Sequence, residues 1–402
     1  MTSSTVTGKV RPSRLAGCLG LGGLGGPFWV LCVGTFINRL GTMVVPFMTL
    51  YLVSGRGLST ANAGEVVGGF GAGALIAPLV GGALADRVGR RVTLLGATLV
   101  SAGIMITLAT VREIAIVVVL VACLGMALEA PRPVSQALVA DIVDERDRTR
   151  AYAVLFWVTN LGFAAAMASA GFIAEAGFAS LFLIDGLTGV LYGVLVWFAF
   201  PEMANHPTAS IDRADGYRRV LRDRTMLGFV LAVALYYFVY LQSDATLSLA
   251  IHRSGLPPST YGLCMALNGA LICFVQPLLA PHLARRDPGR VWATGVVLVG
   301  VGFALTAVAS STLSYLGSVA TWSTGEIFPA TVSGAIVARL APQHLRGRYS
   351  GLYGLALSSG WLTAALGGTK LLSISSTLLW ATCGLLCVVS AAFVQVIASR
   401  LR

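Results

Sequence analysis

The sequence predicts an all-α protein that crosses a lipid bilayer many times. Of its 402 residues, 56% are hydrophobic and only 11% are charged, whereas a soluble globular protein carries about a quarter charged residues. The mean hydropathy is +0.81, and the apolar runs have the length of about 20 residues that spans a bilayer as a helix. The net charge of +11 does not indicate a nucleic-acid partner, because the basic residues are scattered singly through short loops.

Twelve apolar runs have spanning length. We expect membrane spans at about residues 27–53, 60–85, 92–110, 113–140, 151–174, 178–200, 226–251, 259–283, 291–309, 312–339, 348–369 and 376–399. Most of the 28 Lys and Arg residues lie in the two tails and the even-numbered loops. This pattern predicts a multi-pass protein of the cell membrane with both termini in the cytoplasm.

The two halves of the sequence repeat each other. The segment 135–140 (SQALVA) aligns with 333–338 (SGAIVA) at an offset of 198 residues, and the same offset carries Arg148 and Arg150 onto Arg346 and Arg348. Two six-span units in the same orientation predict a binding site between them near the bilayer midplane. We therefore divide the chain into a cytoplasmic N-terminal tail, an N-terminal six-helix bundle, a cytoplasmic linker and a C-terminal six-helix bundle (residues 1–26, 27–200, 201–225 and 226–402).

A short charged hinge separates the second and third spans and reads Gly82-Ala83-Leu84-Ala85-Asp86-Arg87-Val88-Gly89-Arg90-Arg91-Val92. Gly82 and Gly89 lack a Cβ, so we expect close backbone approach and a turn with positive φ in this stretch. Asp86 lies four residues before Arg90, a spacing at which the two side chains can pair.

This hinge resembles the G-x-L-a-D-r-x-G-r-r signature between spans two and three of the major facilitator superfamily. The resemblance implies the major facilitator fold, in which twelve transmembrane helices form two pseudo-symmetric six-helix bundles. It also implies a cytoplasmic gate, in which an acid at the end of span four pairs with the hinge arginine and latches the outward-open state. The gate residues expected on this basis are Gly82, Asp86, Arg87, Gly89, Arg90 and Asp141, although Asp141 could also be a solvated interface charge.

Three charged residues of the N-terminal half fall inside predicted spans. Arg39, with Asn38 beside it, lies roughly 18 Å into span one, and Glu129 lies at a similar depth in span four. Arg132 is one turn from Glu129 on the same helix face. A charge at this depth is costly unless it is paired or wetted, so the three are candidates for a substrate cavity. A structural ion pair that fixes the packing of spans one and four is an equal alternative.

The C-terminal half carries buried acids instead. Glu326 lies near the middle of span ten and Asp244 in the outer part of span seven, and neither has a Lys or Arg nearby on its own helix face. Burial of a carboxylate without a cation favours its neutral form, which brings proton exchange near neutral pH within reach. We therefore take Glu326, Asp244 and Glu129 as proton-coupling candidates, with Glu326 first. The alternative is an acid that stays protonated and hydrogen-bonded. Asp185 and Glu65 are expected to be structural or gate-lining.

Aromatic side chains at a similar level could stack on a flat or cationic ligand. Trp157 and Tyr240 complete the expected substrate cavity, which also contains Asn38, Arg39, Glu129, Arg132 and Glu326. Most aromatic residues at such spacings pack the core or line the interface.

Within the superfamily, the Phe36–Gly41 opening (FINRLG), the Arg132-Pro133 step and the Gly325-Glu326 step resemble bacterial twelve-span drug:proton antiporters. The usual span-five pattern G-x-x-x-G-P-x-x-G-G is altered here, and Met167 stands in place of its proline.

These features predict proton-coupled export of drug-like amphipathic small molecules by alternating access. The alternative is a facilitator that imports or exports a small metabolite, which could be an anion held by Arg39 and Arg132. A receptor or scaffold that moves nothing is a third possibility, against which the lack of a recognisable soluble domain argues. No nucleophile–base set, metal-ligand spacing or phosphate loop indicates an enzyme, a metal or a cofactor. We expect a monomer whose partners are its small-molecule substrate, protons and the bilayer.

Overall fold

The computed structural model describes residues 24–131, 138–139, 142–199, 220–342 and 345–400, and every regular element in this part of the chain is a helix. The first half contains α2 (Gly26–Leu40), α3 (Val44–Leu50), the π-helical η1 (Tyr51–Gly55), α4 (Thr60–Val88), α5 (Arg90–Thr110), α6 (Ile114–Glu129), α8 (Arg148–Ala176) and α9 (Phe178–Ala199). The second half contains α11 (Arg224–Tyr240), α12 (Gln242–Ala245), α13 (Leu247–Arg253), α14 (Pro258–Phe274), α15 (Gln276–Leu283), α16 (Pro288–Leu305), the 3-10 turn η2 (Thr306–Val308), α17 (Thr312–Leu340), α18 (Arg346–Thr363), the π-helical η4 (Ala364–Gly368), α19 (Thr369–Ile374) and α20 (Ser376–Arg400).

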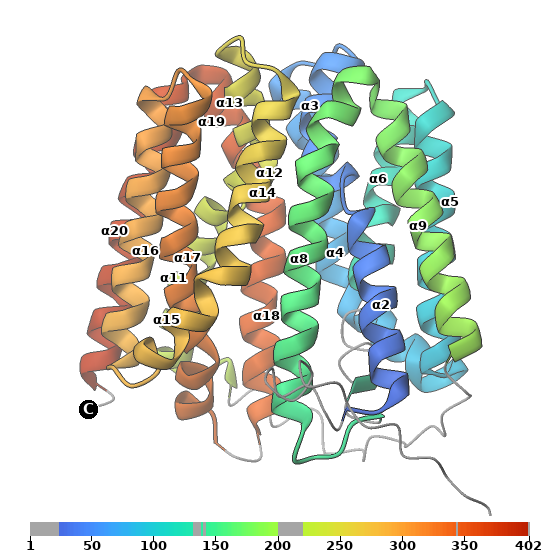
Figure 1. Ribbon diagram of the computed structural model, residues 1–402. Coiled ribbons are helices and arrows are strands. Elements are labelled where there is room, and N and C mark those ends of the chain that lie inside the picture. Colours follow the sequence, from blue (N-terminus) through green and yellow to red (C-terminus); the bar gives the residue numbers. More distant parts are fainter. Residues whose placement is uncertain (1–23, 132–137, 140–141, 200–219, 343–344, 401–402) are drawn as a thin grey trace, which may run out of the picture.

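The helices stand side by side and run along one common direction (Figure 1). Most of the extensive helix pairs lie within one half, and the pairs α8–α14 and α4–α18 join the two halves. The start of α2 and the end of α20 lie at the same end of the molecule, which we call the terminal end (bottom in Figure 1). The other end, which carries α13 and α19, is the distal end.

Eight helical segments among the described residues are long and apolar enough to cross a membrane, and α14 with α15, bent by 53° from each other, can be counted as a ninth. Three predicted spans are not among them. The helix α6 stops at Glu129, after which residues 132–137 lie outside the described part, and α17 and α18 are rich in Ser, Thr and Gly. The count of twelve spans therefore remains a prediction.

The first predicted span is broken between α2 and α3, and a carboxylate from another helix stabilises the break. Both carboxylate oxygens of Asp185 on α9 accept from the backbone N–H of Met43 at 3.1 Å, and one accepts from Val44 at 2.8 Å. These N–H groups begin α3 and would otherwise have no partner, because the first turn of a helix leaves its donors free. Asp185 is only 4% exposed, so the expected structural role fits its geometry.

The seventh predicted span is also broken, into α11, α12 and α13. Here a side chain of the span itself contacts the freed backbone. Gln242 donates from Nε2 to the carbonyl of Phe238 at 2.9 Å, and its Oε1 accepts from the hydroxyl of Thr246 at 2.9 Å. A broken helix inside a membrane is tolerated where its polar groups find such partners.

The two halves meet through backbone at positions occupied by glycine. A Cβ built on Gly269 of α14 would lie 2.8 Å from the Cβ of Ala164 on α8. One built on Gly71 of α4 would lie 2.5 Å from the backbone nitrogen of Leu362 on α18. Small residues allow this kind of close helix packing in a membrane. We call the two contacts the α8–α14 seam and the α4–α18 seam.

Among the described residues, the α4–α18 seam is tight toward the distal end and wider toward the terminal end. Gly82 lies three turns beyond Gly71 on the same face of α4, yet a Cβ at Gly82 would meet no described atom within 4 Å. The same is true of Gly351 on α18, three turns before Leu362. Among the described residues, the close backbone approach in this stretch occurs at Gly81, where a Cβ would lie 2.2 Å from the carbonyl oxygen of Ala130. A close approach at Gly82 itself stays a prediction.

Candidate functional site

Three helices of the second half bring polar side chains together around Glu326, at the midpoint of α17. The hydroxyl of Tyr240, the last residue of α11, donates to Oε1 of Glu326 at 2.8 Å. The amide Nδ2 of Asn268 on α14 donates to Oε2 at 2.9 Å. Each oxygen of the carboxyl group therefore has its own donor, and both donors are neutral.

The residue before Glu326 is a glycine, which allows a further helix to pack closely beside the acid. A Cβ on Gly325 would lie 2.7 Å from the carbonyl oxygen of Gly295 on α16, so α16 and α17 approach closely beside Glu326. The side chain of Glu326 is neither buried nor fully exposed, whereas Asn268 is 5% exposed. The prediction of a midspan acid at Glu326 therefore corresponds to a half-buried carboxyl group with two hydrogen-bond partners.

Asp244 lies on α12, one turn past Tyr240 and beyond the break at Leu241. Its Oδ2 accepts from the hydroxyl of Ser243 at 3.0 Å, and its side chain is half-buried. It belongs to the same region as Glu326, because both carboxyl groups interact electrostatically with Tyr240.

Aromatic rings form a wall beside the Tyr240–Glu326 pair. The ring of Tyr240 stacks on Tyr236 with centroids 5.9 Å apart and meets the edge of Trp322 at 6.1 Å. Trp157, the second aromatic residue expected in the cavity, lies on α8 of the other half, and its place in the cavity stays a prediction. Its carbonyl accepts from Sγ of Cys273 at 3.7 Å across the α8–α14 seam, and 40% of its surface is exposed.

The expected N-terminal cluster is only partly described. Arg39 lies at the end of α2, where Gly162 of α8 packs so closely that a Cβ there would lie 2.7 Å from the Cβ of Arg39. Arg39 and Glu129 are half-buried and both side chains are partnered, and Asn38 is also half-buried. Arg132 lies outside the described residues, so the proposed cluster of the three charges stays a prediction.

The hinge between α4 and α5 turns at Gly89, whose φ of +91° is in the region that favours glycine. The expected positive-φ turn is therefore confirmed at this residue. Arg87 is exposed. The side chains of Asp86 and Arg90 and the whole of Asp141 lie outside the described part, so the gate pairing expected of them stays a prediction. The hinge also contains a contact that the sequence did not suggest. The guanidinium carbon of Arg91 lies over the ring of Trp197, 4.0 Å from the ring centroid.

Polar contacts join the two halves at the distal end. Lys370 and Glu65 form an exposed ion pair at 4.0 Å. Arg253 donates to the hydroxyl of Thr60 at 2.8 Å, and the backbone N–H of Ser259 donates to Glu175 at 3.0 Å. The gate-lining position expected for Glu65 fits this arrangement.

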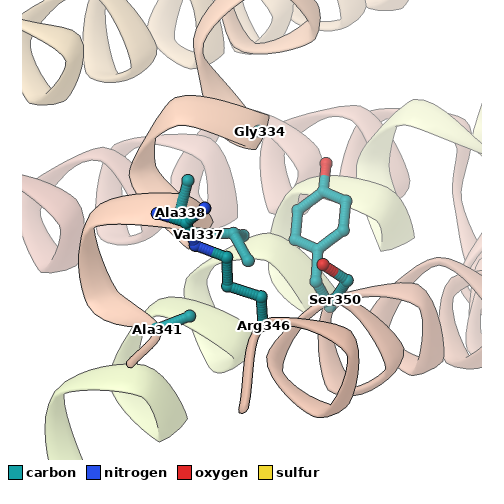
Figure 2. A pocket seen from close by; sticks show the side chains of 7 residues that line it. Gly334, Val337, Ala338, Ala341, Arg346 and Ser350 are labelled. Atoms are coloured by element: carbon teal, nitrogen blue, oxygen red, sulfur yellow. The ribbon is translucent and has the colours of Figure 1, made fainter. Parts of the chain in front are cut away.

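A cavity of about 130 Å³ opens between α17 and α18 near the terminal end (Figure 2). It is lined by Gly334, Val337, Ala338, Ala341, Arg346, Ser350 and Tyr353. Val337 lies roughly 16 Å along α17 from Glu326, so the cavity is separate from the carboxyl group. The hydroxyl of Tyr353 nevertheless lies 3.3 Å from that of Tyr237, one turn before Tyr240 on α11, which connects the cavity to the aromatic wall.

Sequence reasoning found Glu326, Tyr240 and Asp244 but missed Asn268. The signal was present, because Asn268 is an amide in the middle of a predicted apolar span. A buried amide needs hydrogen-bond partners for the same reason that a buried carboxyl group does.

Comparison with known proteins places this architecture. Residues 31–365 match the family Major Facilitator Superfamily. The chain is 24% identical to the multidrug resistance protein MdtH of Aeromonas hydrophila, over 85% of this chain and 87% of that protein. It is 23% identical to a Na(+), Li(+), K(+)/H(+) antiporter of Planococcus maritimus, over 82% and 86%. Its fold matches the crystal structure of the nucleoside transporter NupG with a TM-score of 0.73 at 13% identity, covering 94% and 98% of the two chains. The chain belongs to the Major Facilitator Superfamily and is a membrane-embedded secondary transporter, not an enzyme.

Proposed function

We propose that this transporter exports drug-like amphipathic small molecules in exchange for protons, and that Glu326 is its proton-binding group. The observation that carries the proposal is the pair of neutral donors, Tyr240 and Asn268, on a half-buried carboxyl group at the midpoint of α17. An ionised carboxylate is costly inside a membrane unless it is paired. Proton uptake removes that cost, so the group can hold a proton on one side of the membrane and lose it on the other.

The arrangement of the halves supports alternating access, in which one bundle rocks against the other around a fixed site. The polar contacts at the distal end, and the lack of described atoms within 4 Å of a Cβ at Gly82 near the terminal end, fit a state open toward the termini. With both termini in the cytoplasm, as the distribution of Lys and Arg predicts, this state faces inward.

The likeness to the MdtH multidrug resistance protein and to a cation/H(+) antiporter supports both parts of the proposal. The aromatic wall around Tyr240 supplies apolar and π surface, which suits ligands of varied structure.

The test uses inverted membrane vesicles with an imposed inside-acid pH gradient and a pH-sensitive dye. Lipophilic cations, neutral drugs and small anions are added one at a time. We expect cations or neutral drugs to collapse the gradient in vesicles that contain the protein. Glu326→Gln should reduce this collapse at least about tenfold, since it removes the proposed proton-binding group.

Glu113→Gln is the matched control, because Glu113 is exposed and lies at the distal start of α6. It should behave like the wild type. A Glu326→Gln protein that still exchanges drug for protons at the wild-type rate would refute the assignment of Glu326.

The second candidate function is facilitated transport of a small anion. Arg39 favours it, because this half-buried cation lies beside the break of the first span, where α2 ends. Replacement of Arg39 by Gln should then abolish anion uptake while leaving folding unchanged. A gradient that responds only to anions would favour this function over drug export.

A further inference from the structure

We infer that Asn268 is a positioning residue that links the protonation state of Glu326 to the α8–α14 seam between the two halves. The inference rests on the proposed proton-coupled function. Three observations carry it: the hydrogen bonds of Asn268, the chemistry that those bonds allow, and the place of Asn268 beside a close contact between the halves.

The amide of Asn268 holds two side chains of α17 at once. Its Nδ2 donates to Oε2 of Glu326 at 2.9 Å and to Oγ of Ser323 at 3.0 Å. An amide nitrogen has two N–H groups, so these two bonds use both of them. Asn268 is 5% exposed and Ser323 is fully buried, so water competes little for either bond.

The two partners of Glu326 respond differently to a proton. A phenol hydroxyl can donate or accept, so Tyr240 can keep its bond by turning its hydrogen when the carboxyl group is protonated. An amide nitrogen can only donate. A proton on Oε1, which Tyr240 can then accept, leaves Oε2 as a neutral carbonyl oxygen that accepts from Nδ2 less strongly than a carboxylate does. A proton on Oε2 that points toward Nδ2 displaces the amide. In both cases protonation weakens the hold of Asn268 on Glu326, and the ionised form of Glu326 is the one that the present orientation of Asn268 stabilises.

Movement of Asn268 reaches the seam directly. The next residue, Gly269, is the point at which a Cβ would lie 2.8 Å from the Cβ of Ala164 on α8. One turn further, Cys273 donates to the carbonyl of Trp157 on the same helix of the other half. The residue that contacts the proton site is thus the direct neighbour of a close contact that joins the bundles.

The other titratable groups that interact with Glu326 are Tyr236 and Tyr240 of α11 and Asp244 of α12. The helices α14 and α18, which also pack against α17, carry the titratable residues Cys264 and Tyr353. Between Val291 and Leu305 the neighbouring α16 contains no titratable residue. His282 of α15 and Arg290 of α16 lie toward the terminal end. Asp244 is therefore the other acid of this group, and Asp244→Asn serves as a control for its contribution.

The experiment measures drug–proton exchange across a pH series and, in parallel, maleimide labelling of Cys273. Cys273 is 3% exposed, and a variant that keeps it as the only cysteine reports opening of the seam. For the wild type we expect the labelling rate to change with pH at the same midpoint as transport. Glu326→Gln should lose both pH dependences.

Asn268→Leu removes the amide at similar size. Without the donor that favours the ionised carboxylate, the midpoint of transport should rise by about one pH unit, the order of one hydrogen bond to a charged group. Labelling of Cys273 should lose its pH dependence. Ser323→Ala removes the other acceptor without touching Glu326 and should change neither result. Asn268→Ser, which is too short to reach α17, should repeat both effects if the leucine variant folds poorly.

A folded Asn268 variant in which the pH midpoint of transport and the pH-dependent labelling of Cys273 are the same as with Asn268 present would overturn this inference. It would leave the proposed function intact. Retained pH dependence in Glu326→Gln would instead refute the proposed proton site, and this inference with it.

Discussion

Two carboxyl groups inside the helix bundle, one in each half of the molecule, are held in different ways. Asp185 accepts three contacts from the backbone N–H groups of Met43 and Val44, and Glu326 accepts one bond from each of two side chains, Tyr240 and Asn268. Backbone donors at the start of a helix cannot turn away and they favour a negative charge. Side-chain donors can turn or leave. The N-terminal acid is therefore fixed in one state, and the C-terminal acid is free to change.

The internal repeat makes the contrast sharper. The offset of 198 residues places Cys383 opposite Asp185 and Leu241-Gln242 opposite Met43-Val44. Cys383 is fully buried, and in that half Gln242 contacts the freed backbone of the broken span instead. The same break is thus stabilised by a carboxyl group in one half and by an amide in the other. We therefore regard an acid inside the bundle as a candidate for proton exchange only where its hydrogen-bond donors are side chains that can move away.

The largest expected effect separates these two acids by exchange of each for its amide. Glu326→Gln should abolish pH-dependent exchange and leave the free energy of unfolding within about 1 kcal/mol of the wild type, since an amide can pair with the same side chains. Asp185→Asn should keep pH-dependent exchange in the protein that folds and lose about 2–3 kcal/mol of stability, because one backbone N–H of the break loses its acceptor. Vesicle exchange and thermal unfolding in detergent measure the two quantities. Loss of coupling in Asp185→Asn would show that both acids exchange protons.

A smaller effect is expected next to the two breaks, at a position where the side chains of the two halves differ in size. A Cβ on Gly41 would lie 1.8 Å from the hydroxyl oxygen of Thr188, whereas the repeat places Val239 at the equivalent position of the second half. Gly41→Val should therefore destabilise the protein by about 1–3 kcal/mol through overpacking. Val239→Ala, the matched change in the other half, removes two methyl groups and should cost a similar amount through a cavity. A Gly41→Val protein as stable as the wild type would mean that the first break can widen freely.

The smallest effect is expected at the distal ion pair. Glu65 and Lys370 have side chains that are 60% and 59% exposed, and such pairs contribute less than about 1 kcal/mol. Glu65→Gln and Lys370→Gln should each shift the pH midpoint of exchange only slightly, and the double variant should equal either single one. A shift that grows in the double variant would show that the residues act through different partners.

The sequence predicted the helical class, the family hinge and the depth of Glu326, because length, apolarity and the position of a charge along a span need no knowledge of helix rotation. It did not predict which residues face Glu326. These spans are apolar on all sides, so no periodic pattern shows that Asn268 turns toward α17 while Trp157 lies at the α8–α14 seam. The difference between Gly81 and Gly82 has the same cause, since one residue turns a helix face by about 100°. The N-terminal charges and the gate pairing remain predictions.

The glycine-lined seams have a consequence for the energy of the transport cycle. Surfaces that meet through backbone, as at Gly269 and Gly71, have few interlocking side chains that must disengage when one bundle rolls over the other. The barrier to rolling then depends largely on a few exposed polar contacts, each of which contributes less than about 1 kcal/mol. One pH unit across the membrane is equivalent to about 1.4 kcal/mol per proton. Under the proposed proton coupling, a gradient of one pH unit is therefore comparable in free energy to each contact that holds the two bundles in one orientation.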